Sequence, residues 1–184
     1  MRVELLALAL GKQLLADFSD PEDKEAALRV LSWAARLHEA GISVAHAGYH
    51  KHSAYILGNA DMPGFSKMEQ ARLSLLALTH RGSLSKAREF VSEPSALALL
   101  LALRLAVLFH RSRSEIELPR MEAHLGSVGM ARCELHIEHG WLERNPLTDT
   151  VLHAEVEEWA TLGFDLRIEE AGSKAEKTVK GTGL

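Results

Sequence analysis

Histidines recur at the ends of successive helical patterns within residues 29–82. His38 lies at the end of one such pattern and His80 at the end of another. His50 and His52 lie between them, where a short helix is expected to begin. Imidazole is the commonest metal ligand in proteins, and it binds phosphate when it is protonated. The spacing therefore indicates a segment that handles either a metal ion or phosphate.

The alternative to such a site is that each histidine is a core residue bonded to a main-chain carbonyl. For a single histidine this is the better interpretation. Helical spacing places His38, His52 and His80 on the apolar faces of three successive helices, with Tyr55 on the same face as His52. Three inward-facing histidines together favour a site over three unrelated core residues.

Helix periodicity and capping residues predict the elements that position these histidines. Asp20 is a suitable N-cap, Gly41 a suitable residue just after a helix, and Ser66 with Glu69 a capping box. The first helix has no cap before it, so we expect it to begin upstream of Met1. The predicted helices cover about residues 1–18, 21–40, 50–59, 66–81, 84–91 and 94–111.

The run Ala96–Phe109 is apolar on all sides, which predicts a buried core helix. It is interrupted by Arg104 and is shorter than the roughly 18–20 residues of a membrane span. A guanidinium on such a helix needs a partner or a route to solvent. A phosphate and a buried carboxylate are equally good candidates for that partner.

The pattern changes after residue 114. Alternating apolar and polar residues predict strands at 131–138 and 164–168, and Ile116 and Leu118 hint at an earlier strand. A helix over about 149–162, capped by Thr148, lies between the two clear strands. These elements predict a small α/β unit.

The whole pattern predicts an α+β protein that is mainly α. The expected parts are a helical domain over 1–115, a small α/β domain over 116–170 and a disordered tail over 171–184, where apolar residues are scarce. The single cysteine, Cys133, excludes an internal disulfide and fits a reducing cytoplasm.

The middle of the chain is basic although the formal net charge of the whole chain is −4. Residues 44–114 have nine Lys or Arg and four Asp or Glu, a balance of +5, whereas residues 115–184 have seven and fourteen, a balance of −7. This distribution predicts an anion bound by the middle segment and argues against nucleic-acid binding, for which a basic domain overall is typical. A chance imbalance is the alternative.

Five blocks of sequence follow one another in a distinctive order. They are Trp33–Gly41, His52–Phe65, His80–Gly82, Arg104–Leu108 and Gly140–Thr148. These blocks resemble the C-terminal half of the exopolyphosphatase / guanosine pentaphosphate phosphohydrolase family, and the resemblance extends over about residues 1–168. Five ordered blocks are far more specific than any short motif.

The resemblance implies a helical domain related to the HD metal phosphohydrolases, followed by the small α/β domain. It implies that the catalytic carboxylates and a Mg²⁺ site belong to an N-terminal actin-like domain outside this sequence. No catalytic residue and no cofactor are therefore expected in these 184 residues, which alone should be inactive. The implied partners are polyphosphate or guanosine pentaphosphate and a second copy in a homodimer.

The HD metal positions in this sequence look degenerate. His38 is followed by Glu39 where an HD site has Asp, and Val107 replaces the late aspartate. Loss of that carboxylate removes a strong ligand, so we expect no metal at His38, Glu39, His52 and His80. An independent HD-type metal-dependent phosphohydrolase is the alternative.

A chain of phosphates needs several cations and N–H donors along a path instead of one pocket. Histidine titrates near neutral pH, and an adjacent phosphate favours its charged form. The expected substrate-binding residues are His46, His50, Lys51, His52, His80, Arg81, Lys86 and Arg88.

Overall fold

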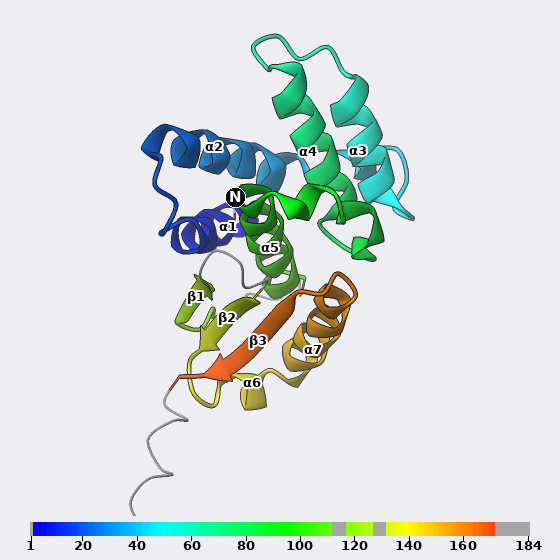
Figure 1. Cartoon of the computed structure of the whole chain (residues 1–184). Coiled ribbons are helices and arrows are strands. Elements are labelled where there is room, and N and C mark those ends of the chain that lie inside the picture. The colour runs from blue at the N-terminus through cyan, green and yellow to red at the C-terminus, as the bar shows by residue number, and fades with distance from the viewer. Residues whose placement is uncertain (1, 112–116, 127–131, 172–184) are drawn as a thin grey trace, which may run out of the picture. The chain divides into compact units, whose positions relative to one another are not determined.

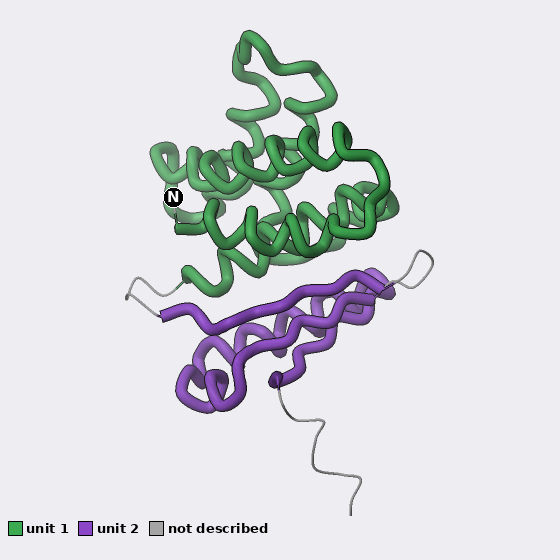
Figure 2. Tube along the Cα trace, turned by 90° about the vertical axis from the view of Figure 1, so that its left-hand side faces the viewer, with its two compact units in different colours: residues 1–116 green, residues 117–184 purple. Residues whose placement is uncertain are grey.

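The computed structural model of the chain describes residues 2–111, 117–126 and 132–171. These residues form helices followed by a small three-stranded mixed sheet (Figure 1). The chain divides into two compact units, residues 1–116 and 117–184, which Figure 2 distinguishes by colour. The predicted class, α+β and mainly α, is confirmed. Most of the expected tail, and Ile116, lie outside the described residues.

The helical unit is built around one buried helix. Within α5, residues 98–106 are all buried, and α1, α2 and α4 pack against this helix. Across the described residues, none of the helices combines the length and apolarity that a membrane crossing requires. The α-helices are α1 (Arg2–Leu14), α2 (Pro21–Leu37), α3 (Tyr49–Asn59), α4 (Lys67–Thr79) and α5 (Pro94–Phe109), and the short 3-10 helices are η1 (Ala40–Ser43), η2 (Leu84–Ala87) and η3 (Phe90–Ser92).

The helix starts follow the predicted capping signals. The Asp20 carboxylate accepts a hydrogen bond from the Glu22 N–H at 2.8 Å, which caps α2. At the start of α4 the Ser66 N–H donates to Glu69 Oε2 at 2.8 Å, and the Glu69 N–H donates to Ser66 Oγ at 3.2 Å. The predicted capping box is therefore present. The single helix predicted over 84–91 is instead the two 3-10 turns η2 and η3.

Gly41 has a different role from the predicted one. Helix α2 ends at Leu37, and Gly41 lies within η1 instead of just after a helix. A Cβ at this position would lie 2.3 Å from the main-chain N of Ser53 and 2.3 Å from the O of Tyr49. The Gly41 N–H donates to Ser53 Oγ at 2.8 Å, and Ser53 Oγ donates to the His38 carbonyl at 2.7 Å. Glycine thus allows η1 and the start of α3 to approach closely.

The second unit is a three-stranded sheet with helices between its second and third strands. Strand β1 pairs antiparallel with β2, and β2 pairs parallel with β3. Alternate residues of β2 are buried, and α7 packs on β3. The elements are β1 (Met121–Leu125), β2 (Arg132–Ile137), α6 (Trp141–Arg144), α7 (Pro146–Ala160) and β3 (Asp165–Glu170).

Three details of this unit differ from the sequence prediction or add to it. Leu118 is not in a strand, because the first strand begins at Met121. Thr148 is buried inside α7, and Asn145 precedes the helix. Cys133 is fully buried in β2, and burial raises the pKa of its thiol to about 12.

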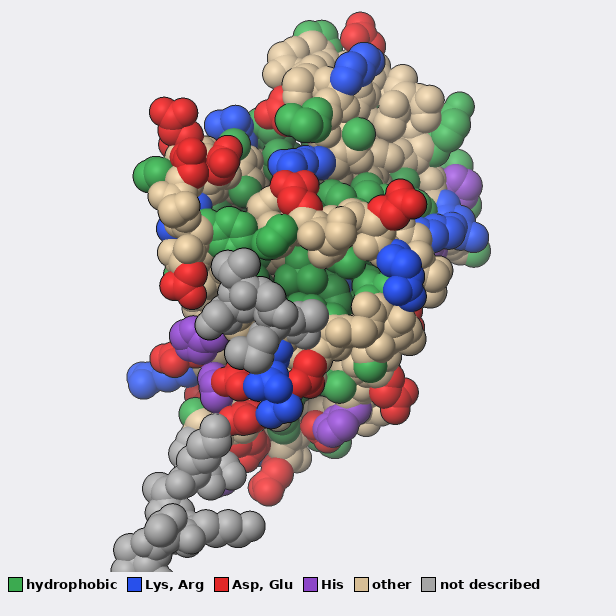
Figure 3. All heavy atoms as spheres, in the orientation of Figure 1, with side chains coloured by type: hydrophobic (Ala, Val, Ile, Leu, Met, Phe, Trp, Pro, Cys, Tyr) green, Lys and Arg blue, Asp and Glu red, His purple; other side chains and the backbone are tan. Residues whose placement is uncertain are grey.

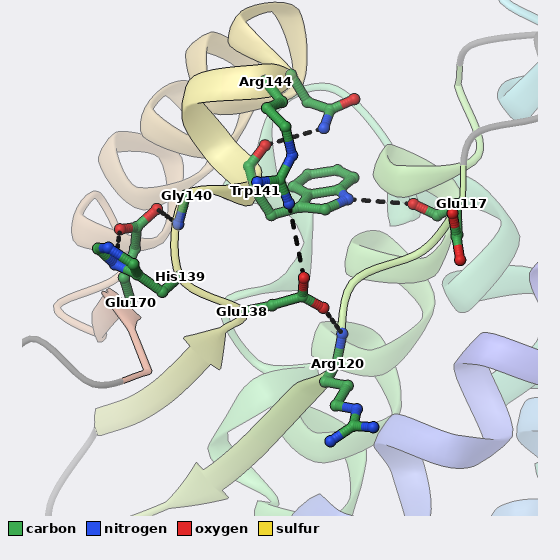
Figure 4. A network of polar contacts seen from close by, with 9 residues as sticks. Glu117, Arg120, Glu138, His139, Gly140, Trp141, Arg144 and Glu170 are labelled. Atoms are coloured by element: carbon green, nitrogen blue, oxygen red, sulfur yellow. Dashed lines mark hydrogen bonds and ion pairs between the residues drawn. The ribbon is translucent and has the colours of Figure 1, made fainter.

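A polar network closes one end of this sheet (Figure 4). The Trp141 indole N–H donates to the main-chain carbonyl of Glu117 at 3.1 Å. The Glu138 carboxylate accepts from the Arg120 main-chain N–H at 3.4 Å and lies 3.6 Å from the Arg144 guanidinium. These contacts fasten the segment before β1 to α6, so this part of the Gly140–Thr148 block has a structural role.

We predict that Gly41→Ala destabilises the helical unit by about 3 kcal/mol, because the new methyl group would overlap two main-chain atoms that cannot rotate away. Urea unfolding of the purified chain measures this change. Gly58→Ala is the matched control. Its Cβ would meet only the Ser74 side chain, with the hydroxyl at 3.1 Å, and we expect a change within about 1 kcal/mol. Equal stability of the two variants would contradict the assigned role of Gly41.

Candidate anion-binding site

Two buried histidines meet at the centre of the candidate site. His38 caps the end of α2 and His80 caps the end of α4. Their ring centroids are 4.9 Å apart in an edge-to-face arrangement. His38 Nδ1 lies 2.9 Å from the Ala35 carbonyl oxygen, and His80 Nδ1 lies 2.7 Å from that of Ala77. Both rings are thus bonded to the last turn of their own helix.

The hydrogen bonds and burial define the protonation of these rings. A carbonyl oxygen only accepts hydrogen bonds, so each Nδ1 must carry the proton. Burial lowers the pKa of His38, and burial together with the neighbouring His38 lowers the pKa of His80 to about 3. At neutral pH the Nε2 of His80 therefore has a free lone pair, and it accepts the Tyr49 O–H at 3.3 Å.

Tyr49 is a site residue that the sequence analysis missed. The residue is 7% exposed, and the Arg81 guanidinium lies 5.1 Å from the centroid of its ring in a cation–π contact. The inward face of α3 contains Tyr49, Ser53 and Leu57, whereas His52 is half-buried and Tyr55 is 71% exposed. The predicted inward face of His52 and Tyr55 is therefore wrong. The four-residue spacing of Tyr49, Ser53 and Leu57 was the signal available in the sequence.

His50 lies beside this buried group and among cations. Its ring centroid is 6.2 Å from that of Tyr49 and 6.4 Å from that of His80. Its Nδ1 is buried and has no hydrogen-bond partner among the described residues. The pKa of His50 is lowered by burial first, and then by four neighbouring basic groups, Arg81, Lys51, Lys86 and His52.

The fold thus brings six of the eight predicted residues into one cluster, which we call the His50 cluster. Figure 3 shows Lys, Arg and His side chains gathered over the start of α3 and the segment after α4. His46 is exposed in the segment before α3, and Arg88 is exposed just after η2. The cluster consists of His50, Lys51, His52, His80, Arg81 and Lys86.

Arg104 holds the turn that presents two of these residues. Its guanidinium is buried and donates to the main-chain carbonyls of Thr79 at 2.7 Å and Gly82 at 3.0 Å. Main-chain carbonyls were not among the partners expected from the sequence. The cation satisfies the negative end of α4 and fixes His80 and Arg81 between its two contacts.

The residues at the HD-like positions do not come together as a ligand set. His38 and His80 meet, but Glu39 is exposed and His52 is only half-buried. Within residues 2–111, 117–126 and 132–171, no three His, Cys, Asp or Glu side chains are placed to hold a metal ion. The described geometry is that of a neutral histidine pair beside exposed cations.

The described residues form a helical unit followed by a small mixed sheet, and the chain belongs to the Ppx/GppA phosphatase family. Residues 1–156 match domain III of that family, which confirms the resemblance. Guanosine-5'-triphosphate,3'-diphosphate pyrophosphatase of Pseudoalteromonas translucida is 36% identical over 142 residues, which is 76% of this chain and 28% of that protein. The protein of the same name from Vibrio parahaemolyticus is 34% identical over 168 residues, 90% of this chain and 32% of that protein. The chain thus spans about a third of the length of these curated relatives.

We predict that Arg104→Met lowers the free energy of unfolding by about 2–4 kcal/mol, because two main-chain carbonyls lose their donor inside the protein. Arg104→Lys should recover part of the loss, since an ammonium can reach one carbonyl but lacks the planar fork. Urea unfolding tests both variants, with the exposed Arg36→Met as the control. If Arg104→Met and Arg36→Met have the same free energy of unfolding, Arg104 does not have the capping role.

We also predict that stability falls as the pH is lowered from 6.5 towards 3. An unfolded histidine takes up a proton near pH 6.5, whereas folded His80 does so only near pH 3, so protonation favours the unfolded chain between these values. His80 alone would contribute a loss of roughly 5 kcal/mol at most.

This pH dependence is measured by urea unfolding at successive pH values. His80→Gln should reduce the slope over the window, while His153→Gln, which replaces an exposed histidine of the second unit, should not. Identical slopes for wild type and His80→Gln would show that His80 is not held neutral.

Proposed function

We propose that this chain is the substrate-holding C-terminal region of a phosphohydrolase that removes terminal phosphate from guanosine pentaphosphate or polyphosphate. Catalysis and Mg²⁺ binding are assigned to the N-terminal actin-like domain that the family resemblance implies. The observation that carries the proposal is the His50 cluster, in which the exposed cations Lys51, Arg81 and Lys86 surround His50 on the domain III fold.

The cations of this cluster are available to a ligand. Among the described residues, none of the ion pairs involves Lys51, Arg81 or Lys86, although other Arg side chains are paired with carboxylates. Cations held close together without carboxylates repel one another, and a bound polyanion relieves that repulsion. Arg88 and His46 are both exposed and remain further phosphate contacts predicted from the sequence.

The relatives bear on the choice of substrate. Those from Pseudoalteromonas and Vibrio are named guanosine-5'-triphosphate,3'-diphosphate pyrophosphatases, which supports a phosphorylated nucleotide as the substrate of the whole protein. Polyphosphate presents the same repeated phosphate oxygens to Lys51 and Arg81. Assembly as a homodimer and a cytoplasmic location remain predictions from the sequence.

An independent HD-type phosphohydrolase is the weaker alternative. Metal-assisted hydrolysis needs a metal held by several ligands with an open position for water. His38 and His80 meet without a third ligand among the described residues. The described geometry therefore favours holding a polyanion over cleaving one.

We predict that Lys51→Ala combined with Arg81→Ala weakens binding of long-chain polyphosphate at least tenfold at low salt, a loss of about 1.4 kcal/mol or more. Two charge-assisted contacts to phosphate are lost, and the dependence of affinity on salt should become shallower. Fluorescence anisotropy or calorimetry at two salt concentrations measures both effects.

The control is Lys12→Ala combined with Lys67→Ala, which removes the same charge from exposed positions of α1 and α4. This variant should bind with nearly wild-type affinity. If both double variants lose affinity equally, binding depends on net charge and not on the His50 cluster. If wild type does not bind polyphosphate or guanosine pentaphosphate at low salt, the proposed function is wrong.

A further inference from the structure

His50 has an unusual environment for a buried ring nitrogen. Its Nδ1 is buried and lacks a hydrogen-bond partner among the described residues, while the Nδ1 atoms of His38 and His80 are each bonded to a carbonyl. A buried polar atom without a partner costs free energy, and such atoms are rare in native proteins. The residue as a whole is only half-buried, so rotation of its ring can bring this nitrogen to a ligand atom that completes the missing bond.

The groups that face His50 are cationic or uncharged. Three come from its own helix α3, two from the end of α4 and one from η2. The neighbouring groups that lower the pKa of His50 are all basic. The facing titratable groups are Tyr49, Lys51, His52, His80, Arg81 and Lys86.

This environment separates His50 from the buried pair. Burial is the main cause that keeps His38 and His80 neutral, and both rings use their Nδ1 atoms within the fold. The pKa of His50 is lowered by burial and also by neighbouring basic groups. A bound ligand can cancel the effect of those groups. An anion among those cations would remove their repulsion and attract the ring's positive charge directly.

We propose that His50 is the proton-linked anchor of the anion site, with its Nδ1–H donating to an oxygen of a phosphate group held by Lys51, Arg81 and Lys86. His50 takes up one proton from solvent as the phosphate binds and releases it as the phosphate leaves. No bond of the phosphate is broken in this step. The inference rests on the proposed function and assigns its regulation by pH.

The linkage has a defined direction. The bound phosphate raises the pKa of His50, so the affinity increases as the pH falls through the interval between the pKa values of the free and the bound state. Below the lower value His50 is charged in both states, and above the higher value it is neutral in both. A rise of one pKa unit corresponds to about tenfold tighter binding across the interval.

Calorimetry of the whole 184-residue chain with long-chain polyphosphate tests the proposal. The titration is run at pH 7 in two buffers of different ionisation enthalpy, because the difference in heat reports the protons taken up. Interior phosphates of the polymer stay ionised near neutral pH, so the protons go to the protein. We expect proton uptake by wild type, and at least half of it should disappear in His50→Gln.

His153→Gln is the matched control, since it removes an exposed histidine of the second unit and should leave the uptake unchanged. A histidine NMR titration with and without polyphosphate should show the His50 pKa rising by about one unit or more on binding. Unfolding curves confirm that His50→Gln is folded.

The outcomes separate this inference from the function it rests on. Binding without proton uptake, or uptake of which His50→Gln keeps more than half, overturns the role of His50 and leaves polyanion binding intact. Absence of polyphosphate binding by wild type overturns both. Binding with uptake that largely depends on His50 supports both.

Discussion

The hydrogen bonds of Arg104 are the constraint on which the anion site depends. A guanidinium from the buried helix α5 reaches the carbonyls of Thr79 and Gly82 and fixes the turn that ends α4. That turn presents His80 inward to the buried histidine pair and Arg81 outward over the Tyr49 ring. A cation deep in the core thus determines where cations lie on the surface. Burying it is tolerable because its charge is met by main-chain dipoles at a helix end.

A second link is made by the Ser53 hydroxyl, which joins two main-chain groups. Ser53 accepts from the Gly41 N–H and donates to the His38 carbonyl, so the end of α2 is tied to α3. The two links bring three helix ends together beneath the exposed cations. The layer directly below these cations is uncharged, because burial keeps His38 and His80 neutral. Protonated histidines there would repel Arg81 and destabilise the cluster.

The sequence predicted what depends on local patterns. Asp20, Ser66 with Glu69, the buried α5 and the alternation of β2 all follow from spacing and capping chemistry. It did not predict features that depend on two segments meeting. The prediction placed the wrong face of α3 inward, because histidine and tyrosine are found both in cores and at surfaces. Packing against α4 is what buries Tyr49 and leaves Tyr55 exposed. Two partners of Arg104 are main-chain carbonyls, which have no signature in a sequence.

The buried thiol of Cys133 has a practical consequence for labelling. It is the chain's only cysteine, it is inaccessible near the start of β2, and its raised pKa leaves almost no thiolate at neutral pH. Maleimide reagents react with thiolates, so we expect almost no labelling of the folded protein at Cys133. A cysteine introduced on an exposed face of α3 would then accept a dye or spin label at one defined place. Movements of that helix could be followed without first removing the native sulfur.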